Sequence, residues 1–275
     1  MDNRTDQEYL RNQQYRNAAN LRARINLHLL YKTNPYDWFH WVFDHFQISE
    51  NASLLELGCG SANLWINNLD RVPLQWSITL SDFSPGMLVE AREKLSVASR
   101  LFHYAVIDAQ HIPAADKQFD AVIANHMIYH IHDQPKAFAE IHRVLKPGGT
   151  LFCATNGEQH LKEFDAFYGL IQPYLLSKIE RTFSAGTFTL ENGDKQLSPW
   201  FTTKLEHYPD ELIITDAEPL VAYLLSMVPM EGCRITAGHI TTLRNYIEDK
   251  IQKDGSIHIT KSTGLFIAHK QTTTR

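Results

Sequence analysis

The sequence contains few cysteines, no long apolar run and no excess of positive charge. Cys59, Cys153 and Cys233 are widely spaced and form no CxxC pair, which argues against a disulfide framework or a zinc site and favours free, buried thiols. The apolar segments fall well short of the roughly 18 residues that a membrane span needs. Because the start MDNRTDQEYL also lacks the apolar core of a secretory signal, we expect a cytoplasmic protein.

The charge balance argues against a nucleic-acid partner. Lys and Arg number 26 against 31 Asp and Glu, for a formal net charge of −5. Such a chain lacks the surplus of cations that binds a phosphate backbone, so we expect no nucleic-acid partner. The short apolar runs lead us to expect no membrane partner. The 275 residues, 44% of them hydrophobic, are typical of one elaborated globular domain.

The N-terminal region lacks glycine. None occurs before Gly58, and apolar residues recur at three- and four-residue intervals up to Tyr31, which predicts an amphipathic helix. After Asn34-Pro35, residues 36–43 form a second, aromatic-rich helical segment. We therefore expect residues 1–50 to form a helical cap.

Residues 51–155 alternate short apolar runs with helical segments. Expected strands cover residues 53–57, 77–81, 101–107, 119–124 and 150–154, with helices over 62–69, 85–95 and 135–145. Ser84-Pro85 and Asp133 mark helix starts, and Lys146-Pro147-Gly148-Gly149 marks a turn after the last helix. Strands joined by helical crossovers form a parallel sheet with helices on both faces, so the fold class is α/β.

The rhythm is less regular in residues 156–275. We expect a helix near 161–175, a strand near 201–207, helices near 219–227 and 237–252, and one closing strand over 257–269. This part would complete the α/β fold and, through helical insertions, cover a ligand site.

Residues suited to a nucleoside ligand follow the first three expected strands. Gly58 and Gly60 lie between a strand and a helix, where a ligand can approach bare backbone. Asp82 follows Gly60 by 22 residues at the next strand end, where a carboxylate can accept from ribose hydroxyls. Asp108 closes the third strand and is suited to an adenine amino group. A glycine turn or a helix-capping Asp is common by itself. The informative feature is that three consecutive strand ends carry residues suited to the same ligand.

These residues carry a family resemblance. The segments LLELGCGSANLW, ITLSDFSPGMLVEAREKL, VIDAQHIPAADKQFDAVIANHMIYHI and EIHRVLKPGGTLF occur in this order and resemble the class I S-adenosylmethionine (SAM) dependent methyltransferases, in particular the type-11 methyltransferase-domain group of bacterial small-molecule enzymes. The resemblance is close over residues 53–155. It implies a Rossmann-like, seven-stranded, mostly parallel sheet with one antiparallel strand, with SAM across the carboxyl edge of residues 51–155.

The resemblance also implies cofactor-binding residues. Gly58, Cys59 and Gly60 would adjoin the methionine and ribose, Asp82 the ribose hydroxyls, Phe83 and Met87 the adenine, Asp108 and Ala109 the adenine edge, Asn125 the methionine amino group through its backbone carbonyl, and Glu56 would support them. The chain departs from many relatives at Ala62-Asn63, where a further glycine or small residue is common.

Three other functions stay open at this point. A dinucleotide-binding dehydrogenase needs a small residue at position 63, where the chain has Asn63. A non-catalytic SAM-binding regulatory protein would retain the same motifs. An RNA or protein methyltransferase would require a basic groove, which the net charge disfavours.

Methyl transfer from a sulfonium needs no metal, because it is an in-line displacement that depends mainly on alignment. If a small-molecule acceptor must lose a proton, His126 and His130 are the candidate bases, with His28 as another. Aromatic rings stabilise cations, and the N-terminal region supplies candidates for this role: Tyr15, Tyr31, Trp38 and Trp41.

Overall fold

The computed structural model describes residues 19–98, 101–175, 187–228 and 234–271. Two described helices open the chain, α2 (Ala19–Tyr31) and α3 (Trp38–Asp44). The Asp37 side chain begins α3 by accepting hydrogen bonds from the backbone N–H groups of Phe39 and His40, at 2.8 and 3.2 Å. The part of the expected first helix before residue 19, including Tyr15, lies outside the described residues.

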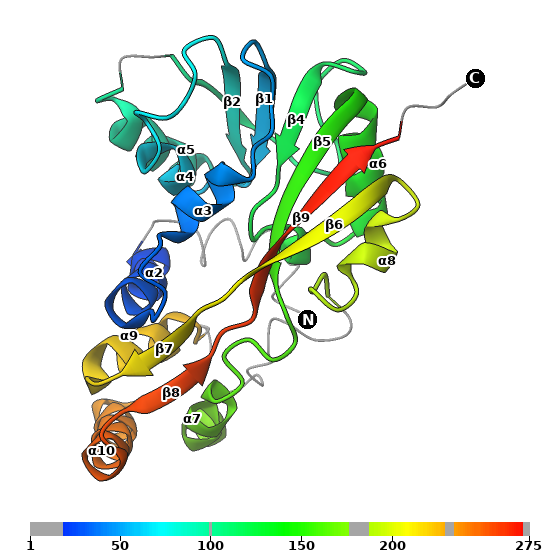
Figure 1. Ribbon diagram of the computed structural model, residues 1–275. Helices are drawn as coiled ribbons and strands as arrows, with labels where there is room; N and C mark the ends of the chain where they lie inside the picture. Colours follow the sequence, from blue (N-terminus) through cyan, green and yellow to red (C-terminus); the bar gives the residue numbers. More distant parts are fainter. Residues whose placement is uncertain (1–18, 99–100, 176–186, 229–233, 272–275) are drawn as a thin grey trace.

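A seven-stranded sheet forms the centre of the molecule (Figure 1). Its spatial order is β3-β2-β1-β4-β5-β9-β6. The strands are β1 (Ser53–Leu57), β2 (Ser77–Asp82), β3 (His103–Val106), β4 (Phe119–Ile123), β5 (Leu145–Asn156), β6 (Phe201–Tyr208) and β9 (Thr263–Lys270). Strands β1 to β5 pair in parallel, whereas β9 is antiparallel to both β5 and β6. The predicted α/β class, with one antiparallel strand, is confirmed.

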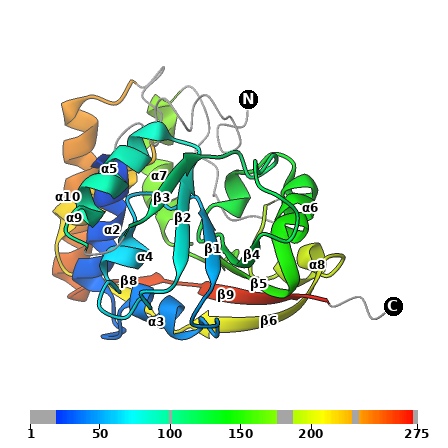
Figure 2. The same cartoon turned by 90° about the horizontal axis from the view of Figure 1, so that it is seen from above.

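Helices cover both faces of this sheet (Figure 2). The short helix α4 (Asn63–Ile66) follows β1, α5 (Pro85–Leu95) follows β2, and both lie on one face. Helices α6 (Gln134–Val144) and α8 (Gly193–Leu197) lie on the other face. Alternate residues of β1 accordingly enter different cores. Leu54 packs in a cluster with Trp65, whereas Leu55 packs in one with Phe138, and all four side chains are buried. Burial on both faces explains the nearly continuous apolar runs of the central strands.

A second unit lies beyond the ends of the parallel strands (Figure 1). Strand β7 (Glu211–Ile214) pairs antiparallel with β8 (Ile257–Thr260) in a separate two-stranded sheet. Around it lie α2, α7 (Phe164–Ile171), the 3-10 turn η3 (Gln172–Tyr174), α9 (Ala217–Ser226) and α10 (Ala237–Asp254). The two strands and the four α-helices share one apolar cluster, to which α2 contributes Leu27. Of the N-terminal cap, α2 is therefore packed onto the C-terminal part of the chain, whereas α3 contributes Val42 and Phe43 to a core cluster of the large sheet.

Two local expectations were wrong. The single closing strand over residues 257–269 is two strands, because the chain leaves β8 at Lys261-Ser262 and each half pairs in a different sheet. Residues 145–149 do not form a separate turn but already belong to β5, which has Gly148 at φ 74° and a register shift against β4. The predicted helix start at Ser84-Pro85 is confirmed, although the Ser84 side chain makes no capping bond. Strand β7 was not predicted.

Cys59 and Cys153 are buried and free, as expected, whereas Cys233 lies outside the described residues. Within the described part of the chain, no helix is both long and apolar enough to cross a membrane.

Candidate functional site

The loop after β1 exposes bare backbone. Gly58 and Gly60 have φ values of 70° and 53°, in the region that favours glycine, and Ala62 follows at 59°. A Cβ on Gly58 would lie 2.8 Å from the Cβ of Met127, so only glycine fits where this loop meets the segment after β4. The Cys59 N–H donates to the Ser81 carbonyl at 2.8 Å and fixes the loop against β2.

Asp82, at the end of β2, ties two loops together. Its Oδ2 accepts from the Gly60 N–H at 2.9 Å and its Oδ1 from the Ser84 N–H at 2.8 Å. Burial raises the pKa of Asp82, although these backbone hydrogen bonds act in the opposite direction. Each carboxylate oxygen keeps further acceptor capacity for a ligand.

Glu56 lies beneath the glycine loop and is only 3% exposed. Its Oε2 accepts from the indole Nε1 of Trp65 at 2.5 Å. Burial raises the pKa of Glu56 to about 8, an effect to which the nearby Asp82 adds. The side chain is therefore mainly an uncharged carboxylic acid at neutral pH.

The segments after β3 and β4 contribute polar groups. Asp108 Oδ1 accepts from the Gln110 N–H at 2.9 Å in a tight turn. The Oδ1 atom of Asn125 is buried without a hydrogen-bond partner. An uncompensated buried oxygen of this kind is costly unless a bound molecule supplies a donor.

All of these groups line one cavity of about 450 Å³. This is a size typical of small-molecule sites, which range from about 300 to 1,000 Å³. The cavity brings together every predicted site residue: Glu56, Gly58, Cys59, Gly60, Asp82, Phe83, Met87, Asp108, Ala109, Asn125, His126 and His130.

His126 and His130 lie on the segment that follows β4. His126 has φ 54°, its N–H donates to the Ala154 carbonyl at 2.9 Å, and its ring centroid lies 5.3 Å from that of Trp38. Burial, followed by the charge of Lys261, lowers the pKa of His126 to about 4. His130 ends the 3-10 turn η2 (Ile128–His130) with its ring 4.5 Å from that of Tyr129.

The N-terminal aromatics divide between the cavity and the core. Of the four predicted to approach a cation, Trp38 is among the described cavity-lining residues and Tyr31 and Trp41 are not. Trp41 packs instead against Tyr208, with ring centroids 5.3 Å apart. Tyr15 lies outside the described residues.

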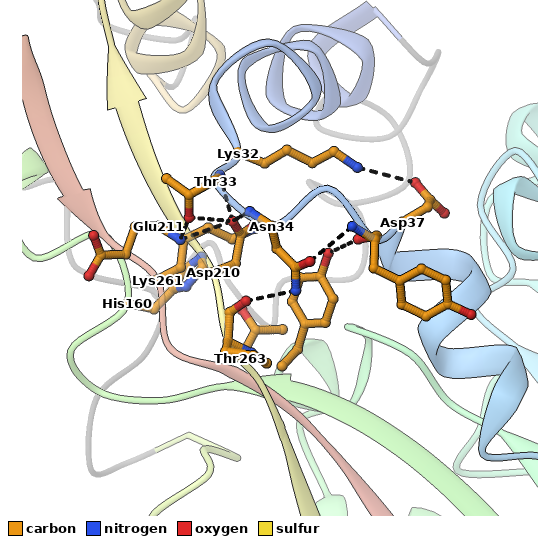
Figure 3. A network of polar contacts seen from close by, with 12 residues as sticks. Lys32, Thr33, Asn34, Asp37, His160, Asp210, Glu211, Lys261 and Thr263 are labelled. Atoms are coloured by element: carbon orange, nitrogen blue, oxygen red, sulfur yellow. Dashed lines mark hydrogen bonds and ion pairs between the residues drawn. The ribbon is translucent and has the colours of Figure 1, made fainter.

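Sequence reasoning missed a polar network at the other end of the cavity (Figure 3). Asp210, whose side chain is fully buried, pairs through Oδ2 with Lys261, and its Oδ1 accepts from the N–H groups of Thr33 and Asn34 at 2.9 and 3.0 Å. Burial acts to raise the pKa of Asp210, but the bonds from Lys261 and Asn34 outweigh it and hold the pKa below its ordinary value. Burial lowers the pKa of Lys261. The network joins α2 to both strand ends of the second unit.

His28, His160 and Tyr223 complete this end of the cavity. His28 was a weak candidate from sequence, whereas the other two gave no signal. The one available signal in the sequence was the polar dipeptide Lys261-Ser262 within an otherwise apolar segment. The pairing of Lys261 with Asp210, however, spans 51 residues and depends on the tertiary fold.

Comparison with known proteins identifies the core. Residues 55–153 match the methyltransferase-domain family. The chain carries a class I SAM-dependent methyltransferase domain. It is 26% identical to a demethylmenaquinone methyltransferase of Staphylococcus epidermidis over 176 residues, which cover 63% of this chain and 68% of that protein. It is 36% identical to a malonyl-[acyl-carrier protein] O-methyltransferase of Geobacter sulfurreducens over 120 residues, 43% of this chain and 44% of that protein.

A similar solved structure extends the likeness of fold to nearly the whole chain. A Haemonchus contortus phosphoethanolamine N-methyltransferase, solved with phosphomonomethylethanolamine and S-adenosylhomocysteine, superposes with a TM-score of 0.59 at 19% identity. The match covers 98% of this chain and 60% of that one. The likeness to that structure is one of fold, and the methyltransferase domain implies the use of SAM.

Proposed function

We propose that this methyltransferase binds SAM along the carboxyl ends of β1 to β4 and transfers its methyl group to a small molecule held in the same cavity. The observation that carries the proposal is the convergence of all ten predicted cofactor residues on one cavity. The glycine loop, the half-buried Asp82 and the unpartnered Asn125 Oδ1 fit a ligand that has a ribose and a charged amino group.

Each strand end has a role in this proposal. Gly58 to Gly60 hold the methionine and ribose portions, and Asp82 accepts from the ribose hydroxyls. Asp108 and Ala109 meet the adenine edge, with Phe83 and Met87 against its ring. Asn125 holds the amino group, and Glu56 supports the loop through its bond to Trp65.

SAM supplies a methyl group on a positively charged sulfur. The enzyme's contribution is chiefly alignment of donor and acceptor, which is worth roughly 7 to 11 kcal/mol in favourable systems. Trp38 is placed at the cavity wall to favour a cation, by about 0.5 to 2 kcal/mol. His126, uncharged and adjacent to Trp38, and His130 are the candidate proton-handling residues of the core, and His28 is a further candidate from the cap.

The cap and the second unit are proposed to enclose the acceptor. His28 and Trp38 come from residues 1–50, and His160, Tyr208 and Tyr223 from residues 156–275, and all of them line the cavity. Relatives named for demethylmenaquinone and for malonyl-acyl-carrier protein support an organic acceptor rather than a nucleic acid.

Thermal unfolding tests the choice of cofactor. We expect SAM and S-adenosylhomocysteine to raise the unfolding temperature and NAD to leave it unchanged, because a ligand at about 100 times its Kd stabilises by roughly 2.7 kcal/mol. Scanning calorimetry with each ligand at equal concentration provides the comparison. Stabilisation by NAD alone would overturn the assignment.

A further inference from the structure

The cavity has two ends that are connected through the segment after β4. Met127 touches Gly58 at the cofactor end, and the preceding residue, His126, lies against Trp38 and feels the charge of Lys261. The cofactor end carries the carboxyl groups of Asp82 and Asp108. The opposite end is where the acceptor must lie under the function proposed above.

Two lysines at the acceptor end are each paired with a carboxylate. Lys261 pairs with Asp210, and Lys32 Nζ lies 3.8 Å from Asp37 Oδ2. The hydrogen-bond donors of Arg24 are also engaged, because its guanidinium donates to the Ser226 hydroxyl and carbonyl oxygens at 3.2 and 3.1 Å. A charged acceptor would lose its hydration at this end, and the lysines and carboxylates there already pair with one another. Binding of a charged acceptor is therefore unfavourable.

His28, on α2, presents an unmet hydrogen-bonding requirement at this end. Its Nδ1 is buried and has no hydrogen-bond partner, although the residue lines the cavity. The ring is flanked by His160, stacked with centroids 6.2 Å apart, and by Tyr223, edge-on at 6.0 Å. A ligand could supply the missing hydrogen bond to Nδ1 by reaching the edge of the ring, or after the ring has turned about its Cβ–Cγ bond.

We propose that the acceptor is an uncharged, planar molecule whose hydroxyl group donates a hydrogen bond to the imidazole of His28. The aromatic walls formed by Trp38, Tyr208 and Tyr223 favour a flat molecule. Burial, followed by the charge of Lys261, lowers the pKa of His28 to about 3, so its imidazole is neutral at pH 7 and has one nitrogen able to accept. This inference rests on the proposed function and specifies its substrate class.

The reaction then balances within the cavity. A lone pair of the acceptor oxygen forms the new O–C bond, the S–C bond breaks, and its electron pair stays on sulfur. The hydroxyl proton leaves the methylated oxygen through the hydrogen bond to the unprotonated nitrogen of His28 and passes on to solvent, because the low pKa of His28 does not favour a lasting imidazolium. The positive charge of the sulfonium thus leaves the cavity with the proton.

Binding of simple probes tests the inference. With the protein saturated with S-adenosylhomocysteine at pH 7, calorimetry or NMR titration compares phenol with toluene, which has the same shape but no donor, and with benzoate, which is anionic. We expect phenol to bind about three- to tenfold more tightly than toluene, the factor that one hydrogen bond typically supplies. Benzoate is expected to bind more weakly than phenol.

Variants of His28 make the test specific. His28→Ala should abolish the preference for phenol over toluene, His28→Gln, which keeps an acceptor oxygen, should restore part of it, and His258→Ala, at an exposed site on β8, should leave it unchanged. Tighter binding of benzoate, no binding of phenol, or an unchanged preference in His28→Ala would overturn the inference. Failure of the proposed function is distinguishable, because it would appear earlier as the absence of S-adenosylhomocysteine binding to the unaltered protein.

Discussion

Replacing Asp82 with alanine is expected to weaken binding of S-adenosylhomocysteine by about a hundredfold or more. The carboxylate would lose bonds to two ribose hydroxyls, and hydrogen bonds to a charged group are worth about 1.5 to 3 kcal/mol each. It would also lose the bond from the Gly60 N–H that fixes the glycine loop. Isothermal titration calorimetry on the folded variant measures the effect.

Asp120 provides a matched control at the opposite edge of the sheet. Its Oδ2 likewise accepts a backbone bond, from the Ser53 N–H at 2.8 Å, and pairs with Lys146 at 2.8 Å, but it does not line the cavity. Asp120→Ala should therefore cost stability and leave affinity within about twofold of the unaltered protein, as expected for a residue outside the site. Equal affinities for Asp82→Ala and the unaltered protein would reject the ribose role.

The free energy of unfolding is expected to fall by about 1.4 kcal/mol per pH unit, through Glu56 alone, between about pH 5.5 and 7.5. In the folded chain burial raises the pKa of Glu56 from 4.5 to about 8. Over this window the unfolded chain has lost the proton that the folded chain retains, so the stabilisation is complete below pH 4.5 and is lost as the pH rises towards 8. Urea unfolding of the ligand-free protein and Glu56→Gln at several pH values isolates this slope.

Glu140→Gln serves as the control for this measurement. The hydrogen bond from Arg143 lowers the pKa of Glu140. The stabilisation that Glu140 contributes is therefore lost only as the pH falls below the ordinary carboxyl range. We expect Glu140→Gln to have the same slope as the unaltered protein and Glu56→Gln to have a shallower fall with pH. Parallel curves for Glu56→Gln and the unaltered protein would mean that Glu56 is ionised in the folded state.

The core of the fold was predictable because its signals are local. Strand β1 was predicted with its observed bounds and α5 with both of its ends, since a buried strand, a glycine loop and a proline-started helix each leave a short-range pattern. The predicted cofactor residues line one cavity for the same reason: they follow consecutive parallel strands, and the carboxyl ends of such strands meet at one edge.

The acceptor end was not predictable in the same way. Strands β7 and β8 are only four residues long each and lie 42 residues apart, so their pairing depends on tertiary packing against α2 and α10. Asp210 looks in the sequence like an ordinary turn residue after Pro209. Its importance arises from Lys261 and the backbone of Thr33, which only the folded chain brings together.

A crystal structure of the protein with S-adenosylhomocysteine would show directly whether the cofactor lies along the carboxyl ends of β1 to β4. We expect the ribose hydroxyls within hydrogen-bonding distance of Asp82, the adenine beside Asp108, and the sulfur facing the side of the cavity that holds His126 and His28. A nucleoside bound elsewhere, or one reversed so that adenine occupies the end lined by His28, would contradict this expectation.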